Sequence, residues 1–214
     1  VNIDFGTSTD IGYGVAVQSD GRILLTGFTN VNGTSDIGTL RLTSTGSLDA
    51  TFGTAGKVIT TIGSGSDFGN DVKVQADGKI LVSGYASVLG NDFTLVRYNS
   101  DGSLDTTFNS TGKAVTNFNA STDDRGTRMF VQADGKIVLA GGTTQSGSYD
   151  LGIARYNSDG TADTSFNPAN TLGGNVAYTE NSAAIVLDAD VQILDAELSS
   201  TSNFSGATLT LTRV

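Results

Sequence analysis

Short segments with an alternating or a continuous apolar pattern follow one another along most of the chain. Residues 70–75 alternate, with Val72 and Val74 on one face and Lys73 on the other, as in a strand buried on one side. In the segment 79–84, the residues Ile80, Leu81 and Val82 are apolar at consecutive positions, which is typical of a strand covered on both faces. The pattern therefore predicts short β-strands in sheets that pack face to face.

The same pattern returns with a period of 57 residues. The segment VQSDGRILLTG at 17–27 recurs as VQADGKILVSG at 74–84 and as VQADGKIVLAG at 131–141. A second element recurs as LRLTSTGSLDATFG, VRYNSDGSLDTTFN and ARYNSDGTADTSFN, which begin at positions 40, 96 and 154. Self-similarity at a fixed period is the signature of a repeat architecture.

A third element, GKVIT at 56–60 and GKAVT at 112–116, is predicted to open repeats two and three, with the N-terminal VNIDF as its remnant in repeat one. The Asp-Gly pair at 77–78 lies between two apolar segments and predicts a tight hairpin. Four strands are then expected in each repeat, and in repeat two they are 57–62, 70–75, 79–84 and 92–99.

Four-stranded antiparallel units that stack face to face are the blades of a β-propeller. The predicted fold class is therefore all-β, with three propeller-type blades in an open or partial propeller and a partial β-sandwich segment at the C-terminus. The repeat pattern fails after Phe166, where Asn167 and Pro168 begin a different sequence. The predicted domain organisation is three repeats at about 1–55, 56–111 and 112–168, a linker at 169–175, and the β segment at 176–214.

The repeated V-Q-A-D-G-K-I-L, followed by D-F-x-L-x-R-Y-N-x-D-G-S-L-D-x-x-F and then Gly-Lys, resembles the bacterial delta-60 repeat. The resemblance covers about residues 1–167 and implies propeller-like blades, as found in tandem in large exported and surface proteins. It carries over no catalytic residue. Repeat one departs from the pattern at 42–45, where Leu-Thr-Ser-Thr replaces Tyr-Asn-Ser-Asp.

Propellers typically close with about 4 to 8 blades, so three blades do not form a ring by themselves. Three arrangements remain open. The chain is a piece of a longer protein, which we favour; or two copies complete a six-bladed ring; or the three units form an open, curved stack.

The composition narrows the function. The chain has 22 acidic and 12 basic residues and a net charge of -10, so neither nucleic acid nor a membrane surface is an expected partner. No apolar run approaches the roughly 18 residues needed to span a bilayer, so membrane insertion is not expected either. It has no cysteine and no histidine, which removes thiolate chemistry, the usual zinc ligands and the usual general base. A Ser-Lys pair or a carboxylate dyad could still run hydrolysis, but no pair stands out. We therefore predict that the chain is not an enzyme.

Several recurring residues are interpreted as structural. Arg97 and Arg155 are predicted to lie between blades and to pair with Asp105 and Asp163, rather than to clamp an anion. The turn NSDGSLD at 99–105 does not fit the spacing of an EF-hand and is predicted to be an Asp-Gly turn. Recurring aromatic residues are interpreted as packing, and recurring lysines as a solvated edge: Phe52, Phe108, Phe166, Tyr98, Tyr156, Lys57, Lys79, Lys113 and Lys136.

The C-terminal segment 176–214 resembles the opening of cadherin-like, immunoglobulin-type modules of bacterial adhesins, through Thr-Glu-Asn-Ser and Asp-Ala-Asp-Val-x-Ile-x-Asp-Ala-Glu. The resemblance implies Ca²⁺ as a possible cofactor, with Glu180, Asp188 and Asp190 as ligands, because carboxylates converging from separate loops suit calcium. The alternative, which we favour, is that Asp188 and Asp190 form the solvated edge of a strand.

Together these features predict a non-catalytic structural or adhesive repeat region of a large bacterial extracellular or cell-surface protein. Its expected partners are a cell-surface glycan or protein, neighbouring modules, or a second copy. The alternative is a glycan-binding or carbohydrate-processing propeller whose site lies in the variable loops 30–36, 87–91 and 143–149, where binding should depend on Tyr149.

Overall fold

The computed structural model describes residues 1–6, 9–31, 33–88, 90–118, 123–145 and 148–166. The chain divides into two units, residues 1–166 and 167–214. The predicted linker 169–175 and the predicted β segment 176–214 lie outside the described residues. All regular elements of the described residues are β-strands, which confirms the predicted all-β class.

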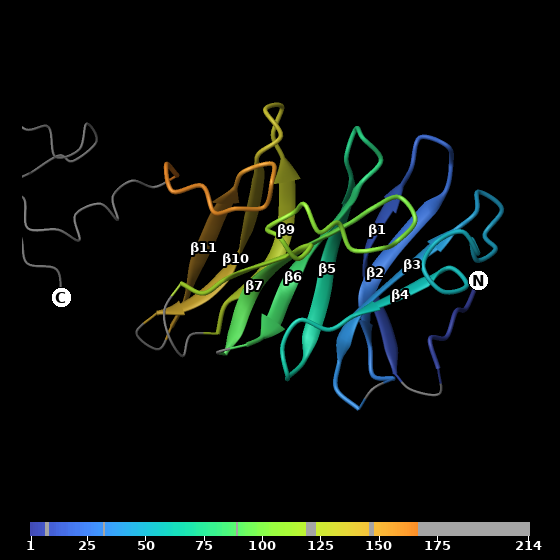
Figure 1. The fold of residues 1–214 in the computed structure, drawn as a ribbon. Coiled ribbons are helices and arrows are strands. Elements are labelled where there is room, and N and C mark those ends of the chain that lie inside the picture. The colour runs from blue at the N-terminus through green and yellow to red at the C-terminus, as the bar shows by residue number, and fades with distance from the viewer. Residues whose placement is uncertain (7–8, 32, 89, 119–122, 146–147, 167–214) are drawn as a thin grey trace, which may run out of the picture. The chain divides into compact units, whose positions relative to one another are not determined.

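The eleven strands form three antiparallel sheets that lie side by side (Figure 1). The first sheet has the order β1-β2-β3-β4, the second β5-β6-β7-β8 and the third β9-β10-β11. The third sheet therefore has three strands in the described part of the chain, where four were predicted. The strands are β1 (Asp10–Val17), β2 (Ile23–Thr29), β3 (Asp36–Leu42), β4 (Lys57–Thr60), β5 (Asp67–Val74), β6 (Ile80–Ser87), β7 (Asn91–Tyr98), β8 (Lys113–Thr116), β9 (Arg125–Val131), β10 (Ile137–Gln145) and β11 (Ser148–Tyr156).

The strands of the Gly-Lys element belong to the preceding sheet, so the prediction that they open repeats two and three was wrong. β4 pairs with β3, with Ile37 opposite Thr60, and β8 pairs with β7 in the same way. The physical reason lies in the turn after β3, where Gly53, Ala55 and Gly56 all have positive φ. This turn sends the chain back antiparallel to β3, so the strand completes the sheet it has just left.

The hairpins between the first and second strands of each sheet were predicted correctly. In the second sheet, Gly78 has φ of 81° and its N–H donates to the carbonyl of Gln75 at 2.9 Å. The predicted alternation in β5 is also present, because Val72 is fully buried while Lys73 is exposed. Continuous burial along β6 confirms that this strand is covered on both faces.

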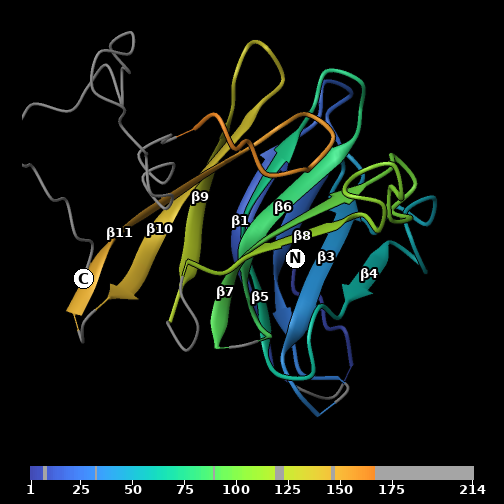
Figure 2. The same cartoon turned by 60° about the vertical axis from the view of Figure 1, so that its left-hand side comes forward.

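The core consists of two apolar layers, one between each pair of neighbouring sheets, and the stacking of the sheets is clearest in Figure 2. The layer between the first and second sheets contains Leu24, Ile37, Phe52, Val72, Ile80, Val82, Val96 and Tyr98. The layer between the second and third sheets contains Leu81, Phe93, Leu95, Phe108, Ala114, Met129, Ile137, Leu139 and Tyr156. Each layer repeats the same positions, as expected for propeller-type blades.

Candidate functional site

An arginine on the third strand of each sheet pairs with an aspartate in the turn that follows. The Nε atoms of Arg41, Arg97 and Arg155 lie 2.8, 2.7 and 2.7 Å from the Oδ2 atoms of Asp49, Asp105 and Asp163. Each guanidinium also lies over a phenylalanine ring, at 4.8, 4.5 and 4.6 Å from the centroid, in the same repeat. The predicted pairing is confirmed for all three repeats, and Phe52 and Phe108 are fully buried as predicted.

The same aspartate binds a second cation. Lys79 and Lys136 approach Asp105 and Asp163 to 2.6 and 2.7 Å, and Arg22 takes this place in the first repeat. The prediction that Lys79 and Lys136 form a solvated edge was therefore wrong. The start of the second strand places each partly buried ammonium group beside the carboxylate, which offsets the cost of its desolvation.

Hydrogen bonds keep these carboxylates ionised. The hydroxyl and N–H of Thr51, together with Arg41, lower the pKa of Asp49 to about 2 against the effect of burial. Burial alone would raise the pKa of Asp105, but hydrogen bonds from Lys79 and Thr107 outweigh it and lower that pKa well below its usual range. These carboxylates thus accept hydrogen bonds from partners within their own cluster.

The clusters of Arg41 and Arg97 also join one sheet to the next. The Nη1 atom of Arg41 donates to the carbonyl of Ser100 at 2.5 Å, and Arg97 donates to Ser158 at 2.6 Å. The N–H of Gly53 donates to the carbonyl of Asp101 at 2.7 Å. We call the arginine, its aspartate, the second cation and the Ser-Asp-Gly turn of the following sheet the junction cluster.

The glycine of that turn is placed directly on the preceding sheet. A Cβ atom on Gly102 would lie 2.9 Å from the nitrogen of Gly53 and 3.0 Å from the ring of Phe52. Gly160 is packed on the ring of Phe108 in the same way. The positive φ of Gly102, 88°, adds a second reason for glycine.

The NSDGSLD turn is therefore a structural turn, as predicted. The Oδ1 atom of Asp101 accepts hydrogen bonds from the N–H and the hydroxyl of Ser103, at 2.9 and 2.6 Å, and Asp159 does the same with Thr161. Within the described residues, no group of three or more His, Cys, Asp or Glu side chains is placed to hold a metal ion.

The recurring tyrosines are buried, as predicted. The hydroxyl groups of Tyr98 and Tyr156 lie 2.6 and 2.7 Å from the hydroxyl groups of Thr60 and Thr116 on the outer strand of the preceding sheet. Burial raises the pKa of both tyrosines to about 12. These side chains are not available to stack on a sugar, and they fasten successive sheets together.

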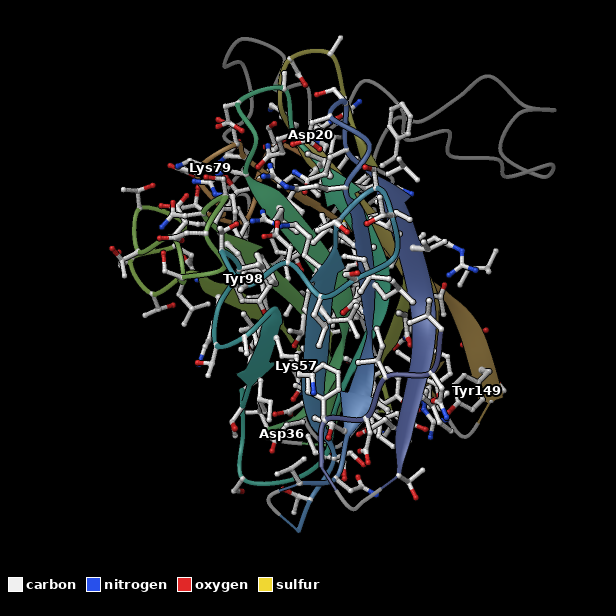
Figure 3. All side chains as sticks on the ribbon, turned by 90° about the vertical axis from the view of Figure 1, so that its right-hand side faces the viewer. Asp20, Asp36, Lys57, Lys79, Tyr98 and Tyr149 are labelled. Carbon is white, nitrogen blue, oxygen red and sulfur yellow. The ribbon has the colours of Figure 1, made fainter. Side chains whose placement is uncertain are left out.

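A second polar cluster lies near the opposite end of the strands. Lys79 marks the end with the junction clusters, and Tyr149 lies near the other end (Figure 3). Asp123 accepts hydrogen bonds from Tyr149, from Arg125 at 2.9 Å and from Asn91 at 2.6 Å. These bonds lower the pKa of Asp123, although its partial burial acts in the opposite direction.

A row of aromatic rings leads to this cluster across the first two sheets. Tyr13 and Phe28 have centroids 6.0 Å apart, Phe28 and Phe68 5.1 Å, and Phe68 and Tyr85 4.7 Å. The guanidinium of Arg125 lies 5.5 Å from the centroid of Tyr85. We call these five side chains the aromatic row.

The variable loops lie at this end, but they connect the second and third strands of each sheet, because the Gly-Lys strand is the fourth and not the first. An open recess with room for small molecules adjoins the loop between β6 and β7. It is lined by Ser64, Gly65, Ser87, Val88, Gly90, Asn91, Asp123 and Thr144. Polar and apolar atoms contribute about equally to the lining, and Tyr149, the residue singled out in the sequence, is hydrogen-bonded to Asp123, one of the lining residues.

Sequence reasoning missed the aromatic row. Phe28 and Tyr85 occupy the same position in their repeats, but Gly142 occupies it in the third, so the signal is present in two copies. The predicted calcium ligands Glu180, Asp188 and Asp190 lie outside the described residues. No stretch of the described residues forms an apolar helix of membrane-crossing length.

Three segments of the chain match the family described as "Domain of unknown function (DUF5122) beta-propeller", at residues 18–52, 75–108 and 132–166. The matched segments run from the first hairpin of each sheet to the phenylalanine that lies under its arginine, which is Phe52, Phe108 or Phe166. The chain thus carries three β-propeller repeats of a kind whose function is unknown. No curated protein matches the chain.

Proposed function

We propose that this chain is a non-catalytic structural and adhesive repeat region of a large bacterial extracellular or cell-surface protein. The observation that carries the proposal is the junction cluster. It is built from recurring residues, and its charged groups pair with each other and with the backbone of the next sheet. Chemistry that serves only to join repeats favours a load-bearing or spacing role over catalysis.

The absence of histidine and cysteine from the sequence supports the non-catalytic part of the proposal. The resemblance to repeats of exported proteins supports a place outside the cell. Both points are tested directly. Chromogenic glycosides, esters and phosphates should show no turnover above buffer, and protease added to intact source cells should remove the protein. Turnover that Tyr149→Ala abolishes and Arg97→Met leaves intact would replace the structural role with an enzymatic one.

The aromatic row favours a second function, which is glycan binding. The exposed ring of Tyr13 offers a flat apolar face to a sugar ring, and Arg125, Asp123 and Asn91, beside Tyr85 at the other end of the row, offer hydrogen bonds. The row is continuous across two sheets, so a linear oligosaccharide fits it better than a single sugar.

A glycan array tests this second function. Binding that is lost in Tyr85→Ala and weakened in Tyr149→Ala supports it. Phe130→Ala is the matched control, because Phe130 is 68% exposed on β9 and does not belong to the row. If Tyr85→Ala, Tyr149→Ala and Phe130→Ala lose binding equally, or if no glycan binds, the glycan-binding function is refuted and only the structural role remains.

A further inference from the structure

The N-terminal residues occupy the place of an outer strand that belongs to a preceding blade. The N–H of Phe5 donates to Asp10 at 2.8 Å. The N–H of Ile62, just after β4, donates to Asp67 at 2.6 Å, and the N–H of Phe118, just after β8, donates to Asp124 at 3.0 Å. Residues 1–5 therefore meet the first sheet as the segments of β4 and β8 meet the second and third.

A second contact repeats in the same way. The ammonium group of Lys113 donates to the carbonyl of Thr61 at 2.7 Å, and that of Lys57 donates to the carbonyl of Asp4. Ile3 occupies the position of Thr60 and Leu42 that of Tyr98, so an apolar pair replaces the hydroxyl pair of the later junctions. Ile3 and Leu42 line one small cavity, beneath the N-terminal segment.

Two complementary edges follow from this placement. Residues 1–5 have the position of a fourth strand but pair with no third strand among the described residues. β11 is a third strand whose outer edge has no fourth strand among those residues. The sequence after Phe166 lacks the Gly-Lys pair that begins β4 and β8. The two edges lie in sheets at opposite ends of the array (Figure 1).

The exposed sheet faces are complementary as well. Leu151 is 97% exposed, although the equivalent residues of the first two sheets, Ile37 and Phe93, are fully buried by the next sheet. At the other end, Val15 is 63% exposed, whereas its equivalent Val72 is fully buried. The exposed face of the third sheet is thus equivalent to the faces by which the first and second sheets contact the sheet that follows. The exposed face of the first sheet is equivalent to the faces by which the second and third sheets contact the sheet before them.

We propose that two copies of this chain associate head to tail, with residues 1–5 of each copy added as the fourth strand to β11 of the other. The register of β3 and β4 places Ile3 opposite Leu151 and Val1 opposite Ile153. Two three-bladed chains joined at both ends form a closed six-bladed ring, within the usual range of about 4 to 8 blades.

The junction cluster is completed across this new interface. Arg155 is 22% exposed, against 4% for Arg41 and 8% for Arg97, because no following turn caps it. In the ring, its Nη1 atom meets the carbonyl of Ser44 of the second copy, and Gly46 of that copy packs on the ring of Phe166. Thr45 replaces the turn aspartate there, but the contact uses only backbone carbonyls.

Cysteine cross-linking of the full chain tests the proposal, because the natural sequence has no cysteine. Opposed residues of antiparallel strands have Cα atoms about 4.5 to 5.5 Å apart, within the range of about 4.4 to 6.8 Å that a disulfide spans. Val1→Cys combined with Ile153→Cys should give a disulfide-linked dimer under mild oxidation. Val1→Cys with Phe130→Cys is the control. Phe130 is exposed, as Ile153 is, but it lies on β9, at the edge of the third sheet opposite to β11.

Sedimentation of the cysteine-free protein should show a dimer at micromolar concentration. Gly46→Ala should weaken the dimer at least tenfold relative to Gly78→Ala. Both glycines have a left-handed φ, 88° and 81°, but only the Cβ atom at position 46 would meet the ring of Phe166 of the partner. A monomer at all concentrations, a disulfide within one chain, an open ladder of linked chains, or equal linking of the control would each overturn the proposal.

Discussion

Replacing Gly102 with alanine tests whether the Ser-Asp-Gly turn is a joint between sheets or only a turn. The matched control is Gly78→Ala. Both glycines follow an aspartate in a tight turn, and their φ angles are 88° and 81°. They differ in their surroundings, because a Cβ atom on Gly78 meets nothing within 4 Å, whereas on Gly102 it would lie 2.9 Å from the backbone of Gly53.

The expected magnitudes follow from this difference. An alanine held at a left-handed φ costs about 1 to 2 kcal/mol, which applies to both positions. Forcing a methyl group against the backbone of Gly53 and the ring of Phe52 adds the cost of overpacking, about 1 to 3 kcal/mol. Gly78→Ala should therefore destabilise the protein by about 1 to 2 kcal/mol and Gly102→Ala by about 2 to 5 kcal/mol.

Urea denaturation, followed by circular dichroism and by Tyr fluorescence, measures both values. The two probes also report whether unfolding is a single transition, which repeat arrays do not always show. If the two variants lose the same free energy of unfolding, the close contact between the second and first sheets contributes nothing, and the reasoning about the junction is refuted.

Three further predictions follow. Arg97→Ala should lower the free energy of unfolding by about 1.5 to 3 kcal/mol, because it removes a charged donor to Asp105 and to the carbonyl of Ser158 and leaves Asp105 with Lys79 as its cation, whereas Arg128→Ala, at an exposed arginine, should change it little; similar losses in urea titrations would contradict the junction role. The lowered pKa of Asp49, about 2, means that its contribution to stability is present above the unfolded pKa near 3.8 and is lost as the pH falls towards 2, so melts should drop across this window and not between pH 5 and 8. Millimolar calcium is expected to leave the melt unchanged relative to chelator; a rise in midpoint that Asp188→Ala with Asp190→Ala removes would instead make those residues a calcium site.

The sequence was informative wherever a structural requirement was local or repeated. The Asp-Gly hairpin at Gly78 needs only two neighbouring residues, and the 57-residue period gave the number of sheets. The pairing of Arg97 with Asp105 was predictable because both residues recur together at constant spacing. A buried guanidinium needs an anion, and the recurring aspartate was the available one.

Other features depend on non-local geometry that the sequence does not display. The sheet to which 57–60 belongs is decided by the path of a turn with three positive φ angles, so the strand closes one sheet instead of opening the next. Lys79 appeared to be a surface lysine until folding placed Asp105 beside it, 26 residues away. The aromatic row combines Phe28 and Tyr85, which are equivalent residues of two repeats, with Tyr13 and Phe68, which are not. The pairing of β1 with β2 and of β5 with β6 brings these rings together.

Amide hydrogen exchange at Gly53 and Asn109 tests the central claim most directly. Both N–H groups lie in turns. The N–H of Gly53 donates to the carbonyl of Asp101 and that of Asn109 to the carbonyl of Asp159, in each case at 2.7 Å and in the next sheet. If the junction clusters bind the sheets into one structural array, these two amides should exchange as slowly as the core amides of β6. Exchange as fast as in the simple turn at Gly78 would contradict the account, because the sheets would then separate without unfolding.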